Sequence, residues 1–187
     1  PWVKFPVPVL QCEAVLNWVI AQAANLHANS QKMLVMGDSA GGNLSAVLAR
    51  KYRQQLRGQV LVYPVLDTTL TSESVKQYPD APVLSKKMMQ FFVDCYIRQD
   101  ANKYDEQVSP LFSTDFANLP PCLMITGEFD ILREDGFAYV QKLKAAGNHT
   151  QHEHSPDIHG FLSLPHLCDS TNDAMAAVVK FVKERMA

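Results

Sequence analysis

Stretches of helical periodicity alternate with short apolar runs along most of this chain. Within residues 11–28 the apolar side chains recur every three to four positions, at Val15, Leu16, Val19, Ile20 and Ala23. This spacing places them on one face of a helix that buries that face against another element. The same reasoning predicts helices over residues 39–55, 86–98 and 134–146, and a last helix that begins at Ser170 or Thr171.

Between these helices lie runs that are too short to be helices and that predict strands. Residues 33–36, 59–65 and 122–126 are mostly apolar, as expected for parallel strands buried on both faces. Residues 150–154 are a weaker fourth candidate, and the polar segments 68–82 and 100–121 are predicted to be irregular. The alternation of strands and helices predicts an α/β fold, with a mostly parallel sheet and helices on both faces.

Composition and charge exclude several classes of function. The 187 residues suit one domain, 1–187, and 47% hydrophobic residues are enough to bury a core. A formal net charge of −2 gives no sign of a nucleic-acid partner, and no apolar run is long enough for a membrane span. Four scattered cysteines favour free buried thiols over a disulfide framework or a zinc knuckle, so we expect a cytoplasmic protein.

The first candidate chemistry lies where a predicted strand meets a predicted helix. Gly37-Asp38-Ser39-Ala40-Gly41 fits Gly-x-Ser-x-Gly, the pattern of a nucleophilic serine on a sharp strand-to-helix turn. Side chains two residues before and after the serine would collide, so glycine is expected at both positions. The turn exposes the Ser39 hydroxyl and directs the Ala40 amide to where an oxyanion would form. Asp38 and Gly42 are expected to shape the turn.

A serine nucleophile needs a base, and the base needs a carboxylate that fixes its tautomer. With this type of turn the chain order is serine, acid, histidine, and each residue lies beyond the carboxyl end of a strand. Asp130 follows the strand 122–126 after a Gly-Glu-Phe link and is the predicted acid, with Glu128 as the alternative. His159 lies in the loop before the last helix and is the predicted base.

The histidines around the predicted base could also be interpreted as part of a metal site. His152, Glu153, His154 and His159 are of the residue types that bind zinc. A strand surface and a catalytic loop account for the same residues without a metal. No metal site is therefore predicted.

Four segments of the chain together resemble one known family, the hormone-sensitive lipase family of esterases, which have the α/β-hydrolase fold. Residues 37–43 are similar to its nucleophile motif, and residues 63–67, 128–136 and 158–161 to its sixth-strand exit, acid motif and histidine loop. Ile131 replaces the usual proline of the acid motif, and Glu134 replaces its second aspartate. The resemblance covers almost the whole chain. It implies a carboxylic ester hydrolase that uses Ser39, Asp130 and His159 and needs no cofactor.

The resemblance is to the C-terminal part of that family's catalytic domain. The family has four earlier strands and a His-Gly-Gly-Gly segment whose amides supply most of its oxyanion hole, and neither is found here. We therefore expect an N-terminally truncated domain, part of a longer protein, whose strand 33–36 is an apolar edge unless a missing segment pairs with it. The amide of Ala40 remains as an oxyanion donor, and losing one donor typically costs about 10²–10³-fold in rate.

The expected reaction is hydrolysis of small, relatively hydrophobic esters through an acyl-enzyme on Ser39, with amide hydrolysis as the runner-up. Met88, Phe92 and Phe161 are candidates for the substrate pocket, although a helical apolar stripe more often belongs to the core. The alternative is a catalytically impaired fragment or a non-enzymatic, ligand-binding relative of the fold. The resemblance also implies a homodimer formed through the last strand.

Overall fold

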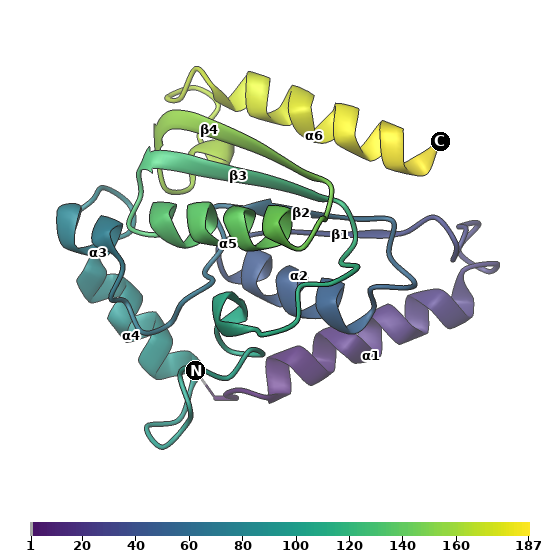
Figure 1. Ribbon diagram of the computed structural model, residues 1–187, viewed down its shortest axis with the longest axis horizontal. Coiled ribbons are helices and arrows are strands. Elements are labelled where there is room, and N and C mark those ends of the chain that lie inside the picture. Colours follow the sequence, from purple (N-terminus) through teal and green to yellow (C-terminus); the bar gives the residue numbers. More distant parts are fainter. Residues whose placement is uncertain (1) are drawn as a thin grey trace.

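A four-stranded parallel sheet forms the centre of the computed structural model, which describes residues 2–187 (Figure 1). Its strands are β1 (Leu34–Asp38), β2 (Gly58–Val62), β3 (Cys122–Phe129) and β4 (Thr150–Ile158). They lie in the order β1-β2-β3-β4, and every neighbouring pair is parallel. The predicted class of fold is confirmed.

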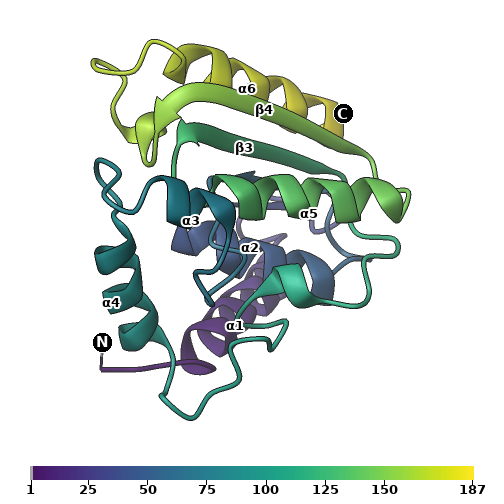
Figure 2. The same cartoon turned by 60° about the vertical axis from the view of Figure 1, so that its left-hand side comes forward.

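Helices cover both faces of this sheet. The longer ones are α1 (Val7–Gln22), α2 (Ala40–Lys51), α4 (Lys86–Tyr96), α5 (Arg133–Ala145) and α6 (Thr171–Met186). Helix α6 lies on one face, whereas α2 and α5 lie on the other, with α1 packed outside α2 (Figure 1). Figure 2 shows α4 and the short α3 (Glu73–Gln77) beyond the ends of the strands.

Several predicted boundaries were wrong. Helix α1 begins at Val7 rather than at residue 11. Pro8 is tolerated in its first turn because the backbone N–H groups of that turn have no partner within the helix. Helix α3 and a short 3-10 helix, Pro110–Phe112, lie in segments predicted to be irregular. Strands β3 and β4 continue to Phe129 and Ile158, so the Gly-Glu-Phe link expected before Asp130 is part of a strand.

Side chains of the two central strands alternate between two hydrophobic clusters. Val60, Val62, Leu123 and Ile125 pack under α6 with Ala174, Val178 and Phe181. The intervening Leu61 and Met124 pack under α2 and α5 with Ala46, Tyr139, Val140 and Leu143. Burial on both faces explains why these strands are apolar at successive positions instead of alternating with polar residues.

A third cluster joins α3 and α4 to the loop after β3. Helix α4 contributes Met89 and Val93 to this cluster, and the loop contributes Ile131 and Leu132. Met88 and Phe92, which we predicted on the apolar stripe of this helix, are exposed, and so is Phe91. The buried stripe of α4 is therefore rotated by about one residue from the predicted one.

Strand β1 forms one edge of the sheet, as expected. Within residues 2–187 no strand pairs with its outer side. A hollow of about 880 Å³ follows this edge and is lined by α1, β1, α2 and α6, with Val15, Met36 and Val182 among its walls. Val15 and Met36 stay exposed, so this edge is both open and apolar.

Among the helices of residues 2–187, none has the length and apolar character needed to cross a bilayer.

Candidate active site

The three residues predicted from motif and chain order each directly follow a strand. Ser39 follows β1, Asp130 follows β3 and His159 follows β4. Because the strands are parallel, their carboxyl ends lie at one edge of the sheet, where α/β folds collect functional side chains. The sheet thus brings together Ser39 and His159, which are 120 residues apart in the chain.

These side chains form one continuous hydrogen-bonded chain. His159 Nε2 lies 3.0 Å from Ser39 Oγ, and His159 Nδ1 lies 2.7 Å from Asp130 Oδ2. An ionised carboxylate can only accept, so the Nδ1 hydrogen donates to Asp130 and leaves Nε2 to accept from the serine hydroxyl. Both distances are within the reach required for proton transfer from a serine to a base.

Burial restricts the acid and the base to this geometry. Asp130 is 1% exposed and His159 is 7% exposed. The second carboxylate oxygen of Asp130 accepts a hydrogen bond from the Leu132 amide at 2.9 Å. The imidazole ring packs against Tyr63, with 4.7 Å between ring centroids. The imidazole is therefore held at its face as well as at both nitrogens.

Tyr63 is a site residue to which the sequence analysis gave no role. It follows β2 directly, between the strands that carry Asp130 and Ser39, and its ring also contacts Phe161 edge to face. Burial raises the pKa of its hydroxyl to about 12, so the ring stays neutral beside the imidazole. Its position after a central strand was the signal that could have indicated this contact.

The nucleophile lies on a strained turn between β1 and α2. Ser39 has φ 52° and ψ −114°, which residues other than glycine rarely adopt. The Ser39 amide donates to the carbonyl oxygen of Val62 at 2.9 Å. The Ser39 carbonyl accepts from the amides of Asn43 at 3.1 Å and Val65 at 3.2 Å. These backbone bonds attach the turn to α2 and to the end of β2.

Two glycines of the motif are required by lack of space, Gly37 as predicted and Gly42 in place of Gly41. A Cβ on Gly37 would lie 2.3 Å from the carbonyl carbon of Gly41, and one on Gly42 would lie 2.7 Å from Cβ of Pro64. A Cβ on Gly41 would meet nothing closer than 3.9 Å, the distance to Asp38 Oδ1. The expectation that Gly41 must lack a side chain for steric reasons was therefore wrong.

Two further residues of the motif have defined positions. Ala40 is the first residue of α2, so its amide lies at the positive end of the helix and has no partner within it. Asn43 is buried, and its Nδ2 donates to the carbonyl oxygens of Val65 at 2.8 Å and Val108 at 2.9 Å. Its side chain thus fixes the loops that follow β2 against α2.

An apolar cavity of about 260 Å³ lies beside Ala40, the residue that follows the nucleophile. Its walls are residues of α2, α4 and the loop after β2, together with one residue of α1: Ala40, Asn43, Leu44, Met89, Phe92, Val93, Tyr96, Val65, Thr68 and Pro8. Of the predicted pocket residues, Phe92 lines this cavity. Met88 is exposed, with its neighbour Met89 lining the cavity instead, and Phe161 is fully buried in the cluster under α6.

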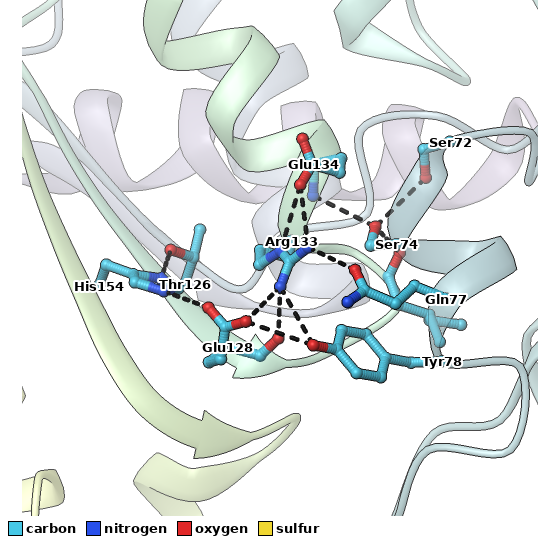
Figure 3. A network of polar contacts seen from close by, with 10 residues as sticks. Ser72, Ser74, Gln77, Tyr78, Thr126, Glu128, Arg133, Glu134 and His154 are labelled. Carbon is cyan, nitrogen blue, oxygen red and sulfur yellow. Dashed lines mark hydrogen bonds and ion pairs between the residues drawn. The ribbon is translucent and has the colours of Figure 1, made fainter.

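The alternative acid and the candidate metal ligands have other partners. Glu128 pairs with Arg133 and with His154, whose Nε2 lies 2.9 Å from Glu128 Oε2 (Figure 3). His152 and His154 each lie 2.9 Å from the hydroxyl of Thr126, whereas His159 belongs to the chain with Ser39. In the part of the chain that the structure describes, no three potential ligands are grouped around a metal position.

A buried acid lies close to the site without belonging to the hydrogen-bonded chain. Asp135, in the first turn of α5, is buried. Burial, and then the charge of Asp67, raises the pKa of its carboxyl well above the usual value. Folding therefore favours the neutral form of Asp135.

Comparison with known proteins identifies the family of this chain. Residues 1–163 match a family described as the alpha/beta hydrolase fold. The fold, the match and the arrangement of the site define the class of protein, an α/β-hydrolase. Within that class the chain belongs to the hormone-sensitive lipase-like family, as its motifs predicted.

Relatives and solved structures give the same assignment. An arylesterase of Saccharolobus solfataricus is 32% identical over 96% of this chain and 60% of its own length. The ethyl acetate hydrolase of Pseudomonas putida is 29% identical over 100% of this chain and 60% of its own length. The structure of a thermophilic carboxylesterase cloned from a metagenomic library matches with a TM-score of 0.94 and 32% identity, over 100% of this chain and 66% of that one. This chain thus spans about 60% of the length of these two curated relatives.

The two outer glycines of the turn are expected to respond oppositely to alanine. Gly37→Ala forces a Cβ into the backbone at Gly41, and overpacking of this kind typically costs about 1–3 kcal/mol. Gly41→Ala has space and improves helix propensity by up to about 1 kcal/mol, so it should leave stability unchanged or raise it. Urea unfolding of both variants measures this, and an equal loss of stability in both would contradict the geometry.

Asp135 gives a pH-dependent prediction for stability. Folding raises the pKa of the Asp135 carboxyl, so this group contributes fully to stability below the pKa that it has in the unfolded state. That contribution to stability is lost as the pH rises above this unfolded-state pKa. Asp135→Asn has no carboxyl to ionise and avoids this loss. The free energy of unfolding of the variant should therefore rise relative to that of the wild type between pH 4.5 and pH 8, by at most about 1.4 kcal/mol per pH unit.

Urea unfolding at several pH values tests this expectation. The control is Asp173→Asn, which alters an exposed acid in the first turn of α6. It shows what removing an exposed carboxylate does to stability over the same pH range. A constant stability difference between Asp135→Asn and wild type across this range would contradict the raised pKa.

Proposed function

We propose that the protein is a serine carboxylic ester hydrolase in which Ser39 forms an acyl-enzyme. The observation that carries this proposal is the hydrogen-bonded chain from Ser39 Oγ through His159 to Asp130. An isolated serine hydroxyl is a weak nucleophile, and a base within hydrogen-bond distance activates it. The curated relatives that are named esterases support the same class of reaction.

In the proposed reaction His159 Nε2 accepts the proton of Ser39 as Oγ attacks the ester carbonyl. The tetrahedral intermediate collapses when the imidazolium returns a proton to the departing alcohol, which leaves an acyl group on Ser39. His159 then removes a proton from water, which attacks the acyl-enzyme and releases the acid. Asp130 stays ionised, keeps the imidazole oriented and stabilises its cationic form.

The amide of Ala40 is the proposed oxyanion donor. It lies next to the nucleophile in sequence and at the N-terminus of α2, where backbone amides and the helix dipole favour negative charge. Each proton transfer in this scheme uses a group of the site or a water molecule. The proposed reaction therefore requires no cofactor.

The cavity beside Ala40 supports small, relatively hydrophobic esters as substrates. Its volume of about 260 Å³ is just below the range of about 300–1,000 Å³ that is usual for ligand pockets. Met89, Phe92 and Val93 give it apolar walls that suit a short alkyl or aryl group. We place either the acyl or the alcohol group of the ester there.

The test measures hydrolysis of p-nitrophenyl acetate and p-nitrophenyl butyrate, together with labelling by a fluorophosphonate. Both should depend on Ser39 and be lost in Ser39→Ala, because the proposed acyl-enzyme and the fluorophosphonate adduct form at its Oγ. Asp130→Asn should keep the fold but lower kcat by about 10⁴-fold, because it reverses the tautomer of the base. The longest form of the polypeptide that can be expressed is assayed in parallel.

A folded wild type that neither hydrolyses these esters nor reacts at Ser39, in either form of the polypeptide, would contradict the proposed activity. A ligand-binding relative of the α/β-hydrolases would then be the better account.

A further inference from the structure

The backbone that carries Asp130 is a short loop held closely at both ends. It leaves β3 after Phe129 and enters α5 at Arg133. The Arg133 amide donates to the Asp130 carbonyl at 3.2 Å, and the Leu132 amide donates to the Asp130 carboxylate. These local bonds shape the loop, but they do not attach it to the rest of the molecule.

The side chain of Arg133 supplies one attachment. Its guanidinium donates to the carbonyl oxygen of Glu128 at 3.1 Å and pairs with the Glu128 carboxylate (Figure 3). It also donates to Oε1 of Gln77 at 2.9 Å and to Oε1 of Glu134 at 3.2 Å, and lies 5.3 Å from the centre of the Tyr78 ring. Although polar, this side chain is only 11% exposed. Arg133 therefore connects the end of β3, the start of α5 and the segment at α3.

Helix α3 supplies a second attachment from more than fifty residues away in the chain. The hydroxyl of Ser74 donates to the carbonyl oxygen of Ile131 at 2.7 Å and accepts from the Glu134 amide at 3.3 Å. Ser74 and Ile131 are both fully buried. The loop is thus bonded to α3 on each side of Leu132, by Ser74 directly and by Arg133 through Gln77.

We propose that Arg133 is a positioning residue for Asp130, an inference that rests on the proposed function. Arg133 touches neither His159 nor Ser39 in any hydrogen bond of the site, and acts by holding the loop so that Asp130 Oδ2 stays 2.7 Å from His159 Nδ1. A displacement of about 1 Å in such a group can cost about 10²-fold in rate. Only the planar guanidinium, with five N–H donors, meets all these acceptors at once.

An ordinary ion pair would have a different effect. Partly exposed pairs contribute little to stability, and removing one should not change the chemistry at a distance. A positioning role and an ordinary ion pair are therefore distinguished by kinetics and by the environment of His159, and not by melting temperature.

The test compares Arg133→Met, Arg133→Lys and Ser74→Ala with Arg50→Met, at temperatures where each variant is folded. Arg50 is a matched control, because it is 15% exposed and pairs with Glu106, far from the Asp130 loop in the chain. Arg133→Met should lower kcat by about 10- to 100-fold with KM unchanged, and Ser74→Ala should lower it less. Arg133→Lys should restore part of the loss, and Arg50→Met should leave kcat unchanged.

Two further readouts separate positioning from folding. The pH dependence of kcat/KM should change in Arg133→Met, because a displaced Asp130 no longer stabilises the cationic form of His159 to the same extent. In an Asp130→Asn background, Arg133→Met should cause no further loss, because the group through which it acts is gone. An undiminished loss in that background, or an unchanged kcat in Arg133→Met, would overturn the proposal.

The low-field proton NMR signal of His159 Nδ1–H gives an outcome that does not depend on turnover. It should shift or broaden in Arg133→Met and stay in place in Arg50→Met. An unchanged signal in Arg133→Met overturns the positioning role even if the wild type proves inactive. An inactive wild type whose signal responds as expected contradicts the proposed function alone.

Discussion

The backbone conformation of Ser39 is the constraint on which the site depends. A non-glycine residue at φ 52° and ψ −114° is unfavourable by about 1–3 kcal/mol, and persists because neighbouring contacts compensate for it. Those contacts are backbone hydrogen bonds to Val62, Val65 and Asn43 and the close approach of the turn at Gly37 and Gly42. The sheet and α2 must therefore both be formed before the serine can take its position.

The same dependence extends to the acid and the base. Because the strands are parallel, Asp130 and His159 lie with Ser39 at the carboxyl ends of the strands. The strands alone do not determine where each side chain points. Tyr63 lies against the face of the imidazole, and Arg133 and Ser74 hold the loop of Asp130. Helix α3, which contributes no predicted catalytic residue, is thus part of the support for the site.

The main elements and the three central residues were predictable because their signals are local. Apolar runs marked β1, β2 and β3, and the chain order of serine, acid and histidine located Ser39, Asp130 and His159. Strand β4 was predicted too short, because as a polar edge strand it lacks an apolar run. Met88 was wrongly predicted to line the pocket, because adjacent methionines give no unique helical phase. The contacts of Tyr63 and Arg133 are tertiary, and the position of Tyr63 after a central strand is the one sequence signal for them that we identify.

The separation of Ser39 and His159 has a consequence for the order of folding. Their hydrogen bond closes a loop of 120 residues that contains β2 and β3, the two strands between β1 and β4. Contacts of such long range are entropically costly and form only when the intervening structure is in place. A partly folded chain could contain most of its helices and still hold the serine and the histidine apart. The reactivity of one hydroxyl would then report whether the whole sheet has assembled.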